Sequence, residues 1–173
     1  MRFTAEVADG WLPHRVSPSI YAAELGQIRQ RAKLLGRNAD EIEGGLYVHG
    51  AISREYDSNK SKYRQIERDA RSLLLYTPKR LKQMKYNVPT YQFDFARFVF
   101  SKERIRALLN DADGIPIEAV KECGLFGKPT ECADKLEQYA KAGVEHLIVN
   151  ILNPNEDKAR AIRLYGRVFS RFA

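Results

Sequence analysis

The sequence predicts an α/β fold in which helices alternate with parallel strands. The clearest evidence is the segment 127–154, which has the pattern of a helix, a glycine stop, a short strand and a turn. Its strand, HLIVNIL at 146–152, is apolar at successive positions, which is typical of a parallel strand covered on both faces. The same succession of helix and strand recurs along the chain, and alternating helices and strands pack as an α/β sheet.

The first element expected is the end of a helix. Phe3, Val7 and Ala8 share one helical face, and the glycine of the following ADG stops the helix at residue 10. The next segment, WLPH at 11–14, is predicted to be a strand that ends in polar residues.

A long amphipathic helix is predicted for residues 18–35. Ser17 is a suitable N-cap, Pro18 fits the first helical turn, and Gly36 ends the helix. After a polar turn, GGLYVHGAI at 44–52 is predicted to be the second strand, with glycines where another backbone approaches closely.

Helices are expected to dominate the rest of the chain. Thr77 and Pro78 form a cap and first-turn pair that begins a new helix after a helical stretch ending at Tyr76. The aromatic-rich segment 88–100 has mixed periodicity and receives no assignment. The remaining helices are predicted at 101–112, 115–124, 129–142 and 155–172. Only three segments in the whole chain have the pattern of a strand.

Composition indicates an ordinary globular chain of one domain. It has 173 residues, 44% hydrophobic and 29% charged, enough for one sizeable core. The N-terminus lacks the apolar region of a secretory signal and no apolar run reaches membrane-spanning length, so we expect a cytoplasmic protein without membrane contact. Cys123 and Cys132 have no metal-binding spacing and are interpreted as reduced thiols in or near the core.

The net charge of +7 is concentrated in one part of the chain. Residues 54–106 contain 14 Lys and Arg against 6 Asp and Glu, a net charge of +8. Three interpretations remain open: a solvated helical face, a surface for an anionic small molecule, and a nucleic-acid surface, the last being the least favoured. No catalytic nucleophile, P-loop or dinucleotide-binding motif stands out, so any redox chemistry would come from a cofactor.

Three segments resemble the C-terminal part of the luciferase-like monooxygenase superfamily, which includes deazaflavin-dependent reductases. They are AEVADGWLPH, then SPSIYAAELGQIRQRAKLLGRNADEIEGGLYVHGAIS, and finally GLFGKPTECADKLEQYAKAGVEHLIV. The chain departs from the family pattern at GKPTE, where Lys128 replaces a threonine. The resemblance implies an α/β fold that is a partial (β/α)8 TIM barrel, made of the last three βα units. Residues 1–173 would be a single domain, and 54–122 a basic, mainly helical insertion within it.

In such a barrel the functional groups follow the carboxyl ends of the strands. The cofactor-binding candidates at these positions are His14, Arg15, His49 and Asn150. Arg15 has the planar fork that suits a carboxylate or phosphate. The side chain of His49 faces either the barrel interior or the surrounding helices, and a core histidine is the simpler interpretation. His146 begins its strand and is interpreted as structural, while Asn153 is first of all a turn signal.

The resemblance implies a flavin- or deazaflavin-dependent oxidoreductase that uses coenzyme F420 or FMN, by hydride transfer or monooxygenation. An anionic cofactor or substrate would suit the basic insertion. The alternative is a half-barrel assembly module without catalysis. Three parallel strands cut from a barrel leave two unpaired edges, at 11–14 and at 146–152. We therefore expect a homo-oligomer, or pairing with a separate N-terminal half-barrel.

Overall fold

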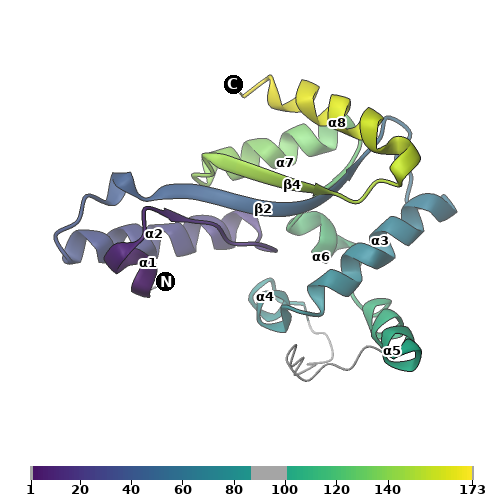
Figure 1. Ribbon diagram of the computed structural model, residues 1–173, viewed down its shortest axis with the longest axis horizontal. Coiled ribbons are helices and arrows are strands. Elements are labelled where there is room, and N and C mark those ends of the chain that lie inside the picture. Colours follow the sequence, from purple (N-terminus) through teal and green to yellow (C-terminus); the bar gives the residue numbers. More distant parts are fainter. Residues whose placement is uncertain (1, 87–100, 173) are drawn as a thin grey trace.

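The computed structural model describes residues 2–86 and 101–172, and shows a small parallel sheet between helices (Figure 1). The unassigned segment 88–100 lies outside the described residues. The elements, in chain order, are α1 (Arg2–Val7), β1 (Gly10–Trp11), α2 (Pro18–Leu34), a 3-10 turn (Ala39–Glu41), β2 (Glu43–Ile52), α3 (Ser61–Leu74), α4 (Pro78–Gln83), α5 (Lys102–Ala112), α6 (Ile117–Glu122), β3 (Leu125–Gly127), α7 (Pro129–Lys141), β4 (His146–Ile151) and α8 (Asn155–Phe169). No helix among the described residues is long and apolar enough to cross a membrane.

Strand β2 is the centre of the sheet, and the other strands that the structure describes run parallel to it. The amides of Glu43 and Tyr47 donate to carbonyls before and after β1, and the amide of Ser53, just beyond β2, donates to Gly127 in β3. In a parallel sheet, alternate residues of a strand direct their N–H and C=O groups at opposite edges. Glu43, Tyr47 and Ser53 are all odd-numbered, so β1 and β3 lie end to end along the same edge of β2. The carbonyl of Gly50 instead accepts from Leu152, so β4 occupies the opposite edge.

The two faces of β2 are covered by different helices. Leu46, Val48 and Ile52 point to one face, where they pack against α2, α7 and α8. Ala51 points to the other face and packs against α3 and α6 near the carboxyl end of the strand. Figure 1 shows α7 and α8 on one side of the sheet, and α3 and α6 on the other. We call these two sides the outer and inner faces of the sheet.

The α/β class, the parallel strands and the main helices are confirmed, and several details of the prediction are wrong. In α1 the buried residue is Ala5, whereas Phe3 and Val7 are exposed, because this short helix packs on α2 with the side that carries Ala5. Strand β1 is Gly10–Trp11 rather than 11–14, although His14 still forms an isolated bridge with Tyr47. Strand β3, at Leu125–Gly127, was not among the three strands that the sequence predicts.

The predicted strand 146–152 is parallel, but it is not covered on both faces. Ile148 is 49% exposed, because β2 is the only described strand that pairs with β4 and no described helix covers that part of the inner face.

Asn153 does more than form a turn. Its buried amide accepts from the N–H of Ile52 and donates to the carbonyl of the same residue, both at 3.1 Å. This side chain therefore continues the β4 edge by one more residue.

Local side-chain hydrogen bonds cap some of the helix starts and not others. Ser17 caps α2 by accepting from the amide of Ile20 at 3.4 Å. The carboxylate of Glu131 accepts from the N–H of Lys128 at the start of α7, at 2.6 Å, so this helix is capped although Lys128 replaces a threonine. Thr77 does not cap α4, because its hydroxyl donates backwards to the carbonyl of Leu74.

Candidate functional site

The four predicted site residues lie on or beside the inner face of the sheet, toward the carboxyl ends of the strands. The parallel register places His14 beside Tyr47, and Tyr47 beside Ile148. One step further along the strands, His49 lies beside Asn150. Because side chains alternate between the faces of a strand, Tyr47 and His49 share the inner face. The register of β2 and β4 thus brings residues a hundred positions apart into contact.

His49 and Asn150 form the polar pair at the centre of this face. The amide Nδ2 of Asn150 lies 3.1 Å from Nδ1 of His49. An amide N–H can only donate, so Nδ1 of His49 accepts and the neutral imidazole carries its proton on Nε2. The ring of Tyr47 meets the imidazole edge-on, with centroids 5.5 Å apart. Nε2 itself is buried and has no hydrogen-bond partner among the described residues.

The environment of His49 keeps its imidazole neutral. Burial is the largest effect, and together with the nearby charges of Arg15 and His14 it lowers the pKa of His49 from 6.5 to about 4. The same causes, burial first and then the charges of Arg15 and Arg80, lower the pKa of His14. At neutral pH both rings are therefore uncharged, and His49 offers an N–H donor rather than a cation.

Arg15 is held in an unusual backbone conformation next to this pair. Its φ of 55° lies in the left-handed region, which is uncommon for residues other than glycine. The guanidinium lies over the ring of Tyr76, 5.8 Å from its centroid, a cation–π contact that helps to hold a partly buried charge. Nε of Arg15 is buried without a hydrogen-bond partner in the part of the chain that the structure describes.

Arg15 and His49 line the same small cavity, together with residues of α3, α6 and β3. The other lining residues are Ala70, Leu74, Val120, Cys123, Gly124 and Phe126. The cavity volume is about 10 Å³, which is room for one water molecule. Two unpaired N–H donors next to one water-sized space can bind a single oxygen atom, of water or of a larger molecule. The space cannot hold an aromatic ring system.

The other sequence interpretations have mixed outcomes. His49 faces the inner side, where its Nδ1 bonds with Asn150 and its Nε2 has no partner among the described residues. His146 is exposed at the opposite end of the sheet and lies 3.3 Å from the carboxylate of Glu43. Sequence reasoning missed the roles of Tyr47 and Tyr76, whose contacts follow from the strand register and from how α3 ends. Cys123 and Cys132 are free and buried, as predicted, and burial raises the pKa of each thiol to about 12.

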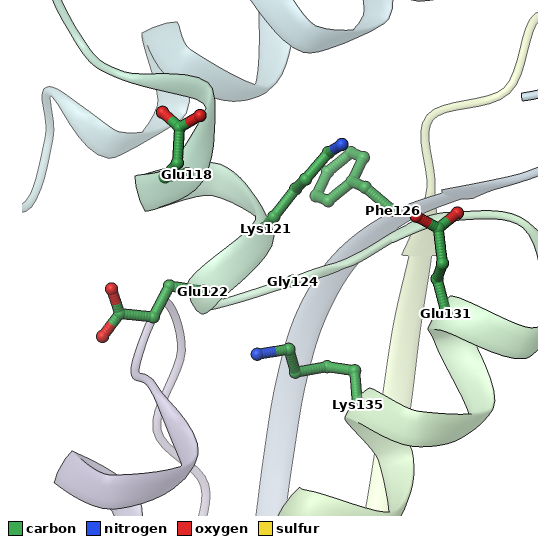
Figure 2. Close-up of a pocket in the computed structure, with 7 residues that line it drawn as sticks. All are labelled: Glu118, Lys121, Glu122, Gly124, Phe126, Glu131 and Lys135. Atoms are coloured by element: carbon green, nitrogen blue, oxygen red, sulfur yellow. The ribbon is translucent and has the colours of Figure 1, made fainter. Parts of the chain in front are cut away.

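Another, more open pocket lies between α6 and α7, and it shares Gly124 and Phe126 with the first (Figure 2). Charged side chains line it, and no ion pair joins any two of them among the described residues. In Figure 2 the ammonium of Lys135 extends across the pocket toward the side of Glu122. Burial lowers the pKa of Lys135. Nothing in the sequence pattern pointed to this pocket, because its walls come from separate helices.

We expect an NMR titration to place the midpoint of His49 near 4. Since the folded pKa lies below the ordinary value of 6.5, the unfolded chain binds more protons between these values. The contribution of His49 to stability is therefore full above pH 6.5 and declines as the pH falls toward 4. Arg15→Met should raise the midpoint, and Arg160→Met, on the exposed side of α8, should leave it unchanged. A midpoint near 6.5 in the wild-type protein would contradict this environment.

Known proteins share both the sequence pattern and the fold. The model of the luciferase-like monooxygenase family matches residues 1–146. The 5,10-methylenetetrahydromethanopterin reductase of Methanopyrus kandleri (strain AV19) is 24% identical over 168 residues, which cover 96% of this chain and 46% of that protein. This chain therefore spans less than half the length of that relative.

Two solved structures show the same arrangement of elements. The coenzyme F420-dependent tetrahydromethanopterin reductase from Methanopyrus kandleri superposes with a TM-score of 0.67 at 21% identity, over 95% of this chain and 45% of that one. An F420-dependent secondary alcohol dehydrogenase, in complex with an F420-acetone adduct, superposes with a TM-score of 0.67 at 14% identity, over 95% and 43%. At these identities the likeness concerns the fold, and it confirms the predicted partial (β/α)8 barrel. Because the family model covers most of the chain, this protein belongs to the luciferase-like monooxygenase family.

Proposed function

We propose that this chain supplies one wall of the cofactor site of a flavin- or deazaflavin-dependent oxidoreductase. The observation that carries the proposal is the group formed by His49, Asn150 and Arg15, in which two buried N–H donors, Nε2 of His49 and Nε of Arg15, have no partner among the described residues. Buried donors without partners are rare in folded proteins and are often completed by a ligand. The relatives support the choice of cofactor, since two are named for F420.

The residues present fit the polar edge of such a cofactor rather than its ring. His49 would donate from Nε2 to a carbonyl or phosphate oxygen, oriented by its hydrogen bond with Asn150. Arg15 would hold a negative charge, such as a phosphate or carboxylate. Tyr47 and the half-exposed Ile148 would provide an apolar surface beside this edge. The bound FMN or F420 would supply the hydride-transfer or oxygen chemistry, and the chain would bind, orient and exclude water.

The basic insertion at 54–122 would supply positive electrostatic potential that attracts an anionic cofactor or substrate. Its helix α4 carries Lys79 and Lys82 next to Arg80, which pairs with Glu24 at 2.5 Å. A nucleic-acid surface remains the less favoured alternative. We also propose that the protein is located in the cytoplasm, as the sequence predicts.

The test is a fluorescence titration of oxidised FMN, and separately of F420, with the purified chain. We expect binding of at least one cofactor, weakened about tenfold or more by Arg15→Met, since a hydrogen bond to a charged group contributes about 1.5–3 kcal/mol. The matched control Arg160→Met removes an exposed arginine on α8 and should bind like the wild type. Absence of binding of both cofactors, or equal binding by Arg15→Met, would contradict the proposed site.

A half-barrel assembly module is the second candidate, and one observation favours it. The apolar side chains of Leu12 and Ile148, which are 54% and 49% exposed on or next to the sheet, would be available for contact with an assembly partner. In this case neither cofactor would bind, and the chain would instead require a partner to bury these side chains.

A further inference from the structure

The pocket between α6 and α7 is built from one continuous stretch of the chain (Figure 2). All of its lining residues lie between Glu118 and Lys135, so α6, β3 and the start of α7 form its walls and no other element contributes to them. The pocket volume is about 320 Å³, which lies at the small end of the range of about 300–1,000 Å³ for small-molecule sites. Unlike the cavity beside His49, this pocket has room for a small organic molecule.

Two ammonium groups line the pocket without an acidic partner. Lys121 and Lys135 are both half-buried, and neither forms an ion pair with any residue that the structure describes. The ammonium of Lys135 donates to Oε1 of Gln138 at 3.3 Å, and burial lowers its pKa. Because an ammonium has three N–H donors, that of Lys135 can bind two further acceptors.

Carboxylates face the same space. Glu122 is half-buried on the side toward which Lys135 extends in Figure 2, and its Oε2 accepts from the hydroxyl of Tyr86 at 3.0 Å. Glu118 and Glu131 also line the pocket and are exposed. The ammonium of Lys135 and the carboxylate of Glu122 thus share one pocket without pairing, and a ligand between them would be close to both charges.

We propose that this pocket binds a small zwitterion, of which a free α-amino acid is the simplest kind. The carboxylate of the ligand would accept from Lys135, and its ammonium would donate to Glu122. A purely anionic ligand would lie beside the carboxylate of Glu122, and a purely cationic one beside the ammonium of Lys135, so each would meet a like charge. A molecule that carries both charges suits both side chains.

An aromatic ring in the pocket favours an amino acid with an apolar side chain. Phe126 is 6% exposed and lines the pocket together with Gly124. A Cβ at Gly124 would lie 2.4 Å from Cε2 of the Phe126 ring, so the ring packs directly against the backbone and is held in place. An apolar side chain that contacts this ring would be removed from water. Leucine is therefore the ligand to test.

Three related ligands separate the two charges of the zwitterion. They are L-leucine, isocaproate, which lacks the ammonium, and isoamylamine, which lacks the carboxylate. In an NMR titration of the purified chain, leucine should cause saturable shifts of the backbone amides of Gly124 and Lys135 at about millimolar concentrations. The other two ligands should bind about tenfold more weakly or less, since each loses a hydrogen bond between charged groups. Absence of saturable shifts with leucine, or equal binding of either comparison ligand, would overturn the proposal.

Two substitutions should change the preference in opposite directions. Lys135→Met should weaken leucine binding about tenfold or more and strengthen that of isoamylamine, whereas Glu122→Gln should weaken leucine binding by a similar factor and strengthen that of isocaproate. The control Lys141→Met, on the same helix as Lys135 and with a side chain that is 74% exposed, should bind leucine like the wild type. If the Lys135 and Glu122 variants both bind leucine like the wild type, the ligand lies elsewhere and the proposal is wrong.

Either variant alone decides the question if the other does not fold, and circular dichroism shows which of them are folded. Neither substitution alters His49, Asn150 or Arg15, so the titrations with FMN and F420 should be unchanged in both variants. The zwitterion site and the proposed cofactor site can therefore fail separately.

Discussion

Gly44→Ala is expected to lower the free energy of unfolding by about 3 kcal/mol or more, or to prevent folding. A Cβ at this position would lie 2.3 Å from the carbonyl oxygen of Gly143 and 2.7 Å from the hydroxyl of Tyr21. Neither atom can move easily. Gly143 has a φ of 95° and forms the turn between α7 and β4, and Tyr21 is fully buried under the sheet. The new methyl group would therefore separate β2 from the turn that leads into β4.

Two other glycines of the same chain provide matched controls. Gly26 and Gly166 lie on exposed sides of α2 and α8, and a Cβ at either position would meet no atom within 4 Å. Gly26→Ala and Gly166→Ala should each stabilise the protein by about 1 kcal/mol, the difference in helix propensity between glycine and alanine. Urea unfolding followed by circular dichroism measures all three. Equal stability of Gly44→Ala and the wild type would show that β2 and the 143 turn are not packed as described.

Local signals in the sequence were sufficient for most of the helices. Ser17 caps α2 as predicted, and Gly36 and Gly143 both adopt the positive φ expected of a residue that ends a helix. These features depend on a few neighbouring residues, so the sequence contains all the information needed. Thr77 shows the limit of such reasoning, because its hydroxyl had a second acceptor one turn earlier.

The short strands and the burial of β4 could not be predicted in the same way. Strand β3 has only three residues, too few for any periodicity, and it forms because Ala51 and its neighbours in β2 offer a free edge there. The strand 146–152 is mostly apolar, and such a pattern cannot tell a strand with two covered faces from one with an exposed face. Coverage depends on which other elements lie nearby, which is a property of the tertiary structure.

The candidate site was predictable in position and not in chemistry. The rule that functional groups follow the carboxyl ends of parallel strands selected His14, Arg15, His49 and Asn150, and the structure places all four at the inner face. The tautomer of His49 depends on the register of β2 against β4, which no local pattern specifies. Tyr76, which lies under the guanidinium of Arg15, comes from the end of a helix whose path is set by packing.

The second large effect is expected at Tyr139, which connects α7 to the loop that carries Arg15. Its side chain is fully buried and its hydroxyl donates to the carbonyl of Val16 at 2.7 Å. Tyr139→Ala removes a whole aromatic ring from the outer-face core and should cost about 3–5 kcal/mol of unfolding free energy. Tyr139→Phe keeps the ring and leaves the buried carbonyl of Val16 without its partner, which should cost about 1–3 kcal/mol.

The phenylalanine variant also tests whether this hydrogen bond positions the candidate site. Val16 directly follows Arg15, so a loosened loop would move the guanidinium away from His49, and the lowered pKa of His49 should rise toward its ordinary value. The control is Tyr63→Phe, which keeps a buried ring and removes a hydroxyl that has no hydrogen bond among the described residues. Urea unfolding and an NMR titration of His49 on both variants separate the two roles. If Tyr139→Phe loses stability while the titration of His49 stays unchanged, Tyr139 supports the core alone and the loop is held in place by the cation–π contact with Tyr76.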